Sequence, residues 1–177
     1  LCLKSNVNLH LEATAVLLAN PDEGIYKLSA FGENRGEGMM WIYANGADNI
    51  SITGKGTIHG NGIAFMGKEL DDSYELKPVT TFDPRPHVLT LTDVKNLTIR
   101  DITIRDGAYW TVHLIGCDGA VIDGISLLNN LKIRNGDGID LDHSRNVRIS
   151  NCHITSGDDC ICLKNRREFE QYGPCHD

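Results

Sequence analysis

Aspartates are concentrated in two short segments of this sequence. The first segment, NGDGIDLD, covers residues 135–142, and the second, SGDDCICLKN, covers residues 156–165. Apolar and polar residues alternate in both segments, as they do in a half-buried β-strand. Neighbouring carboxylates repel one another, and this repulsion raises the pKa of at least one of them. A protonated acid beside ionised carboxylates is an arrangement that can hydrolyse glycosidic bonds.

The sequence repeats itself, and the repeats predict which acids meet. Four segments align without gaps, beginning at Trp41, Val88, Thr111 and Gly138. Each segment carries a turn residue, namely Asn49, Asn96, Gly119 or Asn146. Three positions after the turn residue comes an isoleucine, at Ile52, Ile99, Ile122 and Ile149. Two further units are indicated by CICLKN from residue 160 and by SNVNLHLEATAVLL from residue 5.

These units predict an all-β fold, a right-handed parallel β-helix. They show period-two alternation with β-branched residues and turn residues, and no helical periodicity. One unit cannot bury its apolar face alone, so the units must stack as a solenoid. We expect a single domain over residues 1–177, with one interior ladder formed by Leu91, Leu114, Leu141 and Leu163 and another by the four isoleucines. A leucine-rich-repeat horseshoe is the competing solenoid, but the units lack its leucine consensus and its helical half.

The stacking of the units predicts which acidic side chains lie next to one another. Residues at equal offsets in adjacent coils lie about 4.8 Å apart. Asp137 and Asp159 each precede an aligned isoleucine by two positions, so we expect them to stack, with Asp158 beside them. The same alternation predicts a set of polar side chains that point outward from one sheet: His113, Asp140, Asp142 and Lys164.

Other interpretations of the acids stay open. Any single aspartate could be a turn former, because Asp and Asn favour the turns between strands. Clustered carboxylates on a β-helix could instead bind calcium through their oxygens. The six cysteines show no zinc-binding spacing, so buried thiols or one or two disulfides are expected rather than a metal site.

Composition narrows the choice of partners. The formal net charge of -7 argues against nucleic acid, which would require a basic surface. No apolar run approaches the length of a membrane span, so no membrane partner is expected. The first residues, LCLKSNVNLH, lack the layout of a secretion signal.

Two long segments, and two short motifs in the acidic region, resemble a known family. The segments RNVRISNCHITSGDDCICLKN and KSNVNLHLEATAVLLANPD resemble the polygalacturonase family of glycoside hydrolases (family twenty-eight), right-handed β-helix enzymes that hydrolyse α-1,4-galacturonate linkages of pectin. The family is marked by Asn-Thr-Asp, then Gly-Asp-Asp, then Gly-His-Gly, then Arg-Ile-Lys. Here NGD matches the first motif with glycine in place of threonine, and GDD matches the second outright.

The resemblance implies roles for particular residues. Asp158 would be the general acid, and Asp137 and Asp159 would together activate the attacking water, with inversion at the anomeric centre. Asn135 would help to shape the site. From their predicted positions, Asp140, His113 and Lys164 are further candidates for substrate binding, and Lys164 could attract a uronate carboxylate. No cofactor and no metal are expected.

The later motifs of the family are missing. Neither Gly-His-Gly nor Arg-Ile-Lys occurs, and the sequence stops at EQYGPCHD, so we expect a partial β-helix, truncated at its C-terminal end. The resemblance also implies a pectic polysaccharide or oligogalacturonide as substrate, a monomeric full-length enzyme, and a secreted or periplasmic location. A calcium-dependent lyase of the pectate-lyase kind and a non-catalytic carbohydrate-binding β-helix are the alternatives.

Overall fold

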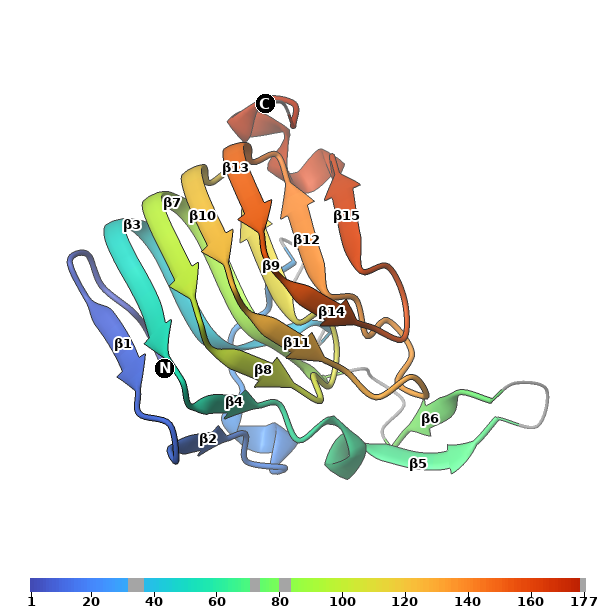
Figure 1. The fold of residues 1–177 in the computed structure, drawn as a ribbon. Helices are drawn as coiled ribbons and strands as arrows, with labels where there is room; N and C mark the ends of the chain where they lie inside the picture. Colours follow the sequence, from blue (N-terminus) through green and yellow to red (C-terminus); the bar gives the residue numbers. More distant parts are fainter. Residues whose placement is uncertain (32–36, 71–73, 80–83, 176–177) are drawn as a thin grey trace.

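The protein is a right-handed parallel β-helix whose coils stack along one axis (Figure 1). The computed structural model describes residues 1–31, 37–70, 74–79 and 84–175. Over these residues the fold contains β-strands and short 3₁₀ helices but no α-helix, so the leucine-rich-repeat alternative is wrong. The 3₁₀ helices are η1 (Glu23–Ile25), η2 (Gly62–Phe65) and η3 (Arg167–Tyr172).

The largest sheet runs through every coil. Its main path follows β1 (Asn8–Leu11), β3 (Met39–Gly54), β7 (Pro86–Arg100), β9 (Val112–Ile115), β12 (Ile139–Asp142) and β15 (Ile161–Lys164). The strands β10 (Asp118–Asp123) and β13 (Arg145–Ser150) continue it beyond a corner of the coil. The first half of β7 pairs with β9 and its second half with β10, so one long strand serves two faces of the solenoid.

Two smaller sheets complete the fold. One has the order β14 (His153–Thr155), β11 (Ser126–Leu128), β8 (Thr103–Arg105), β4 (Thr57–His59) and β2 (Val16–Leu18). The other is an antiparallel hairpin of β5 (Met66–Glu69) and β6 (Leu76–Pro78), which projects from the side of the solenoid (Figure 1). The hairpin contacts the loop before the first acid motif, through a bridge from Leu76 to Ile133 and an ion pair between Glu69 and Lys132.

The predicted ladders pair in the expected register, but Leu163, in the last coil, is 69% exposed and is not an interior residue. Both pair in register through the parallel strands, and the aligned positions are Leu91, Leu114, Leu141 and Leu163 in one ladder and Ile52, Ile99, Ile122 and Ile149 in the other. Ile52, Ile99 and Ile122 are fully buried. Burying an isoleucine or leucine side chain contributes about 1.5–3 kcal/mol, so the ladders account for much of the stability of the stack.

The predicted turn residues form a ladder of their own. Asn49, Asn96 and Asn146 all have a φ of 55° to 58°, the left-handed region that asparagine tolerates better than most residues. The Asn96 side-chain amide donates to Asn49, and the Asn49 amide donates to Asn6 in the preceding coil. This asparagine ladder explains why the sequence keeps asparagine at the turn of successive units.

The cysteines differ from the expected disulfides. All six lie in the described part of the chain and are free thiols. Cys117 is fully buried, and burial raises its pKa to about 12. This thiol packs as a small apolar group in the core. A buried thiol was one of the two expectations for the cysteines.

Candidate active site

Three aspartates meet at the beginning of neighbouring strands. Asp137 precedes β12, and Asp158 and Asp159 precede β15. The backbone ladder extends to these residues, because the Gly138 N–H donates to the Asp159 carbonyl over 2.8 Å. Each residue contributes a carboxylate oxygen that lies within 4.8 Å of those of the other two. The stacking of Asp137 over Asp159 therefore agrees with the register predicted from the repeats.

The three acids differ in their exposure. Asp137 is 3% exposed, whereas Asp158 and Asp159 lie on the surface. The Asp158 carboxylate also accepts the Asp159 N–H over 3.0 Å, which orders the turn that carries both. One nearly buried carboxylate thus faces two that solvent or a ligand can reach.

Buried polar groups fix the backbone of Asp137. The side-chain amide of Asn129 donates to the Gly136 carbonyl over 3.0 Å and to the Thr111 hydroxyl over 2.7 Å. Its carbonyl oxygen accepts the Gly107 N–H over 3.0 Å. With Asn129 only 6% exposed, these bonds tie the loop before β12 to the preceding coil.

Arg85 holds the same loop from another direction. Its side chain is fully buried, and it donates to the carbonyls of Ala108 and Arg134 over 2.9 Å and 2.7 Å. The guanidinium also lies 4.7 Å from the ring centroid of Tyr109, a cation–π distance. These roles of Arg85 and Asn129 could not be predicted from the sequence, because neither residue occupies an aligned repeat position.

Lys164 lies among carboxylates. Its ammonium is 3.0 Å from Asp140 and 3.4 Å from Asp137, and it sits 4.3 Å from the centroid of the Trp110 ring. Burial lowers the pKa of Lys164, but the charges of Asp140 and Asp137 outweigh this effect and raise it overall. Lys164 therefore stays protonated at every pH at which a glycosidase works.

Asp140 and Asp137 both hold their protons more tightly than a free aspartate. Burial, followed by the charge of Asp137, raises the pKa of Asp140 to about 8. Burial also raises the pKa of Asp137, Lys164 opposes this rise, and Asp158 adds to it. The pair Asp137 and Asp140 therefore retains one proton through mildly acidic conditions.

The outward-facing polar set lies on the predicted sheet face but not at the surface. The register places His113 opposite Asp140 and Asp142 opposite Lys164, as expected. However, His113, Asp140 and Asp142 are fully buried, so the expectation of an exposed set is wrong for these three. Aromatic rings cover this part of the sheet, and those in contact with the His113 ring are Phe31, Trp110 and Phe169.

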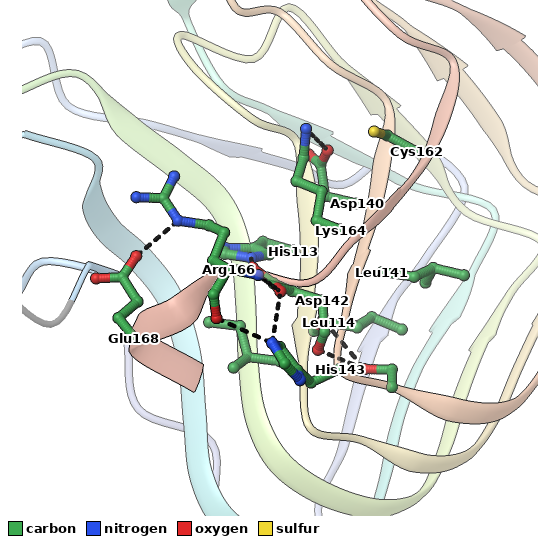
Figure 2. Close-up of polar contacts among 12 residues, drawn as sticks. His113, Leu114, Asp140, Leu141, Asp142, His143, Cys162, Lys164, Arg166 and Glu168 are labelled. Carbon is green, nitrogen blue, oxygen red and sulfur yellow. Dashed lines mark hydrogen bonds and ion pairs between the residues drawn. The ribbon is translucent and has the colours of Figure 1, made fainter. Parts of the chain in front are cut away.

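The segment that carries Phe169 is anchored to the same face (Figure 2). The Arg166 N–H donates to the Asp142 carboxylate over 3.0 Å, and His143 lies 2.9 Å from the Arg166 carbonyl. His113 approaches the other oxygen of Asp142 at 3.5 Å. Burial lowers the pKa of His113 although Asp142 opposes this shift, which is the direction for a neutral imidazole under an aromatic cover.

The predicted residue Asn135 and the neighbouring Arg166 occupy less central places. Asn135 adopts a left-handed conformation, with a φ of 54°, at the turn before Gly136 and Asp137. The Arg166 guanidinium is bound to Glu168 and packs on Phe31. Structure thus brings Asp137, Asp158, Asp159, Asp140 and Lys164 together, leaves Asn135 at the edge, and keeps His113 below the surface.

The acid cluster alone does not indicate a metal site. Two of its three members are exposed, and the ammonium of Lys164 lies within 3.4 Å of the third. A cation at this point would have to compete with that ammonium for Asp137. The arrangement instead suits acid–base chemistry, with carboxylates of unequal environment side by side.

Comparison with known proteins gives consistent results. The sequence profile of glycosyl hydrolases family 28 matches residues 3–171. A probable polygalacturonase of Vitis vinifera is 31% identical over 97% of this chain and 35% of its own length. An exopolygalacturonase of Oenothera organensis is 27% identical over 90% of this chain and 40% of its own length.

Solved structures of the same kind share the fold. The polygalacturonase from Erwinia carotovora ssp. carotovora superposes with a TM-score of 0.77 at 25% identity, covering 94% of this chain and 47% of that one. The family 28 exopolygalacturonase of Yersinia enterocolitica gives a TM-score of 0.76 at 23% identity, covering 92% of this chain and 36% of that one. The chain spans about a third of the length of the Vitis vinifera relative. From the match over nearly its whole length, this chain belongs to glycosyl hydrolases family 28.

Proposed function

We propose that this chain carries the acid residues of a polygalacturonase, which hydrolyses α-1,4-galacturonosidic linkages of pectin. The observation that carries the proposal is the approach of three carboxylates, from Asp137, Asp158 and Asp159, to within 4.8 Å of one another. Family membership supplies the reaction class, and the relatives named as polygalacturonases and exopolygalacturonases support the substrate.

In the proposed mechanism the three acids divide the proton transfers. Asp158, an exposed member of the cluster, donates a proton to the glycosidic oxygen as the bond from that oxygen to the anomeric carbon breaks. Asp137 and Asp159 orient a water and accept its proton as its oxygen bonds to the anomeric carbon. Asn135 shapes the turn from which Asp137 projects.

The stereochemical outcome is a separate part of the proposal. Inverting enzymes usually separate two carboxyl groups by about 6.5–9.5 Å, and retaining enzymes by about 5–5.5 Å. The oxygens of the cluster approach more closely, within 4.8 Å, but three acids share the work here. We propose inversion, with the water held jointly by Asp137 and Asp159. Proton NMR of the anomeric signals formed in the first minutes distinguishes the two outcomes.

Recognition of the substrate involves fewer of the predicted residues than the sequence indicated. His113 and Asp140 are fully buried, so we leave them out of the proposed substrate-binding set. Lys164 is already paired with two carboxylates. Arg167, the first residue of η3, is exposed and is available to attract a uronate carboxylate.

A hydrolysis assay tests the proposal. Polygalacturonate is incubated with the protein, and reducing ends and ultraviolet absorbance are followed together. We expect reducing ends without absorbance, and a loss of at least 100-fold in Asp158→Asn and Asp159→Asn, the order of magnitude of acid–base catalysis. Asp48→Asn, an exposed residue on β3, is the matched control. Rising absorbance would show that a lyase produces an unsaturated end, and would overturn the proposal.

A binding measurement addresses the carbohydrate-binding alternative. Affinity for oligogalacturonides is measured by calorimetry for the wild type and for Asp158→Asn. Equal binding with turnover only in the wild type supports catalysis by Asp158. Equal binding with no turnover in either protein favours a non-catalytic binding role for this chain.

The proposed location follows from the proposed substrate. Pectin lies outside the plasma membrane, so we propose that the enzyme is secreted or periplasmic. The family resemblance supports the further proposal that the full-length enzyme is a monomer. The part of the chain that the structure describes contains no helix of the length and apolarity that a membrane crossing requires.

A further inference from the structure

Lys164 is positioned by carboxylates and an aromatic ring rather than by solvent. Its side chain is 18% exposed, and those of its partners Asp137 and Asp140 are 4% and 0% exposed. The ion pair to Asp140 is drawn in Figure 2, with Cys162 nearby on the same strand. The Trp110 ring lies under the ammonium at 4.3 Å and excludes water from one side of it.

The direction of the side chain is informative. In the strand register Lys164 stands opposite Asp142, yet its ammonium contacts Asp140 and Asp137 instead. The side chain therefore leans back along β12 toward the strand's beginning, where the acid cluster lies. A lysine that served only to attract a substrate carboxylate would gain nothing from two ion pairs below the surface.

We propose that Lys164 is a positioning residue, which orients the Asp137 carboxylate beside Asp159 and opposes its protonation, while Asp140 anchors the ammonium. This inference rests on the proposed function, in which Asp137 is half of the base. It assigns Lys164 to the acid cluster and removes it from the substrate-binding residues.

Four titratable side chains face the Asp137 carboxylate and influence its ionisation. Lys164 faces it from β15, Asp140 from its own strand, and Asp158 and Asp159 from the turn before β15. Asp140 is protonated in mildly acidic conditions, since its pKa is raised to about 8 by burial and by the charge of Asp137. With Asp140 neutral, the Lys164 ammonium favours the ionised form of Asp137, and it also lies 3.0 Å from an Asp140 carboxyl oxygen.

Carbon-13 NMR of labelled aspartate carboxyls tests this arrangement without requiring activity. The Asp137 signal is assigned by its absence in Asp137→Asn and is titrated in each variant. An opposite charge at this range lowers a carboxyl pKa by about 1–3 units, so we expect Lys164→Gln to raise the pKa of Asp137 by that amount. Lys164→Arg, which keeps the charge, should leave it below the value in Lys164→Gln. The exposed Lys4 provides the control Lys4→Gln.

Two further variants guard against a folding defect. Asp140→Asn imitates the protonated side chain, so the pKa of Asp137 should stay within about half a unit of the wild type, because the local charge is unchanged. The double variant Lys164→Gln with Asp140→Asn removes the anchor as well as the ammonium, and should still show the raised pKa. An unchanged pKa of Asp137 in both Lys164→Gln and the double variant overturns the proposal.

Kinetics separates positioning from substrate binding. A base must be ionised, so the acid limb of kcat should move to higher pH in Lys164→Gln by the shift seen in the NMR titration, with KM changed less than threefold. A raised KM with an unmoved acid limb would instead assign Lys164 to the substrate and contradict the proposal. If the wild-type chain shows no turnover, the proposed function loses support, whereas the NMR titration still decides the role of Lys164.

Discussion

Both the backbone next to Asp137 and the Asp137 carboxylate are held by polar contacts. Asn129 binds the carbonyls just before β12, and Lys164 contacts the carboxylate. Its neighbours Asp158 and Asp159 are exposed by comparison, on a turn whose backbone carbonyls accept hydrogen bonds from Ser156 and Gly138. At the scale of residues, the site therefore combines one rigid acid with two that can adjust to a bound sugar.

Asn129→Ala should lower both stability and activity. The substitution leaves the Gly107 N–H and the Gly136 carbonyl without their partner, and an unsatisfied buried group costs about 1–3 kcal/mol. We expect the free energy of unfolding in urea to fall by about 2–4 kcal/mol. Asn130→Ala in the neighbouring position, where the exposed side-chain hydrogen bond is from the Lys132 N–H, should cost much less. Equal losses in both variants would contradict the role of Asn129.

The raised pKa of Asp140 predicts a pH dependence of stability. A free aspartate loses its proton near pH 4, whereas Asp140 holds it to about pH 8. Between these values the folded state binds more protons than the unfolded state, so this contribution to stability falls as the pH rises. The slope is at most about 1.4 kcal/mol per pH unit.

Urea unfolding of wild type and Asp140→Asn at pH 5 and pH 8 measures that contribution. Because asparagine does not titrate, the variant should gain stability relative to the wild type as the pH rises. Comparing the two proteins cancels the contribution of groups such as His113. A difference that is the same at both pH values would show that Asp140 titrates normally.

The stacking of Asp137 and Asp159 could be predicted from the sequence, because the strand register alone determines it. Asp137 and Asp159 share an offset in aligned units, and parallel strands preserve that offset. Burial of His113 was not predictable in this way, because the rings that cover it come from Phe31 and Phe169, which lie outside the repeats. Periodicity tells which face of a sheet a residue points to, but not what lies on top of that face.

At the scale of elements, η3 covers the sheet beside the site. Phe169 is 7% exposed and packs edge-on to His113, and the Tyr172 ring lies against Gly116, where no room remains for a larger side chain. The Asp142 carboxylate holds the N-terminal end of this segment through the Arg166 N–H. A short 3₁₀ helix therefore determines the solvent access of a strand histidine.

Phe169→Ala should uncover that histidine. We expect a loss of about 3 kcal/mol in stability from the missing ring. The pKa of His113, lowered chiefly by burial, should move back toward its ordinary value, which a titration of imidazole signals by NMR detects. Tyr74→Ala, at an aromatic residue that is 66% exposed, is the control for loss of a ring. An unmoved His113 pKa would mean that Phe31 and Trp110 suffice as cover.

The asparagine ladder makes a second prediction for the elements. Asn96→Ala loses the hydrogen bond to Asn49 and places alanine in the left-handed region, each at about 1 kcal/mol. The free energy of unfolding should fall by about 2 kcal/mol in urea. Asn96→Gly tolerates the backbone conformation and loses only the hydrogen bond, so it should cost about half as much. Equal costs would assign the whole effect to the side chain.

At the scale of the whole molecule, stability depends on contacts between coils. Each interior side chain packs against equivalent residues above and below it, as Ile99 does between Ile52 and Ile122. Ile99→Ala should therefore cost about 2–5 kcal/mol, whereas Val16→Ala, at a residue 60% exposed on β2, should cost under 1 kcal/mol. Urea unfolding measures both variants.

The solenoid as a whole was predictable from the sequence, because its units repeat the same offsets. The hairpin of β5 and β6 was not, since it interrupts the coils between Phe65 and Val79 and obeys no repeat. Its contact with Lys132 and Ile133, next to the acid motif, depends on long-range packing. An insertion of this kind changes the surroundings of a site while the solenoid itself stays the same.

The asparagine ladder also bears on how the coils assemble. Each amide donates in one direction along the axis, from Asn96 to Asn49 and from Asn49 to Asn6, and the pattern resumes where Asn146 donates to Asp118. A coil that slipped by one residue would break these side-chain hydrogen bonds between neighbouring turns. The turns therefore favour the aligned register of neighbouring coils, and a slip by one residue would also turn the interior side chains to the opposite face of the sheet.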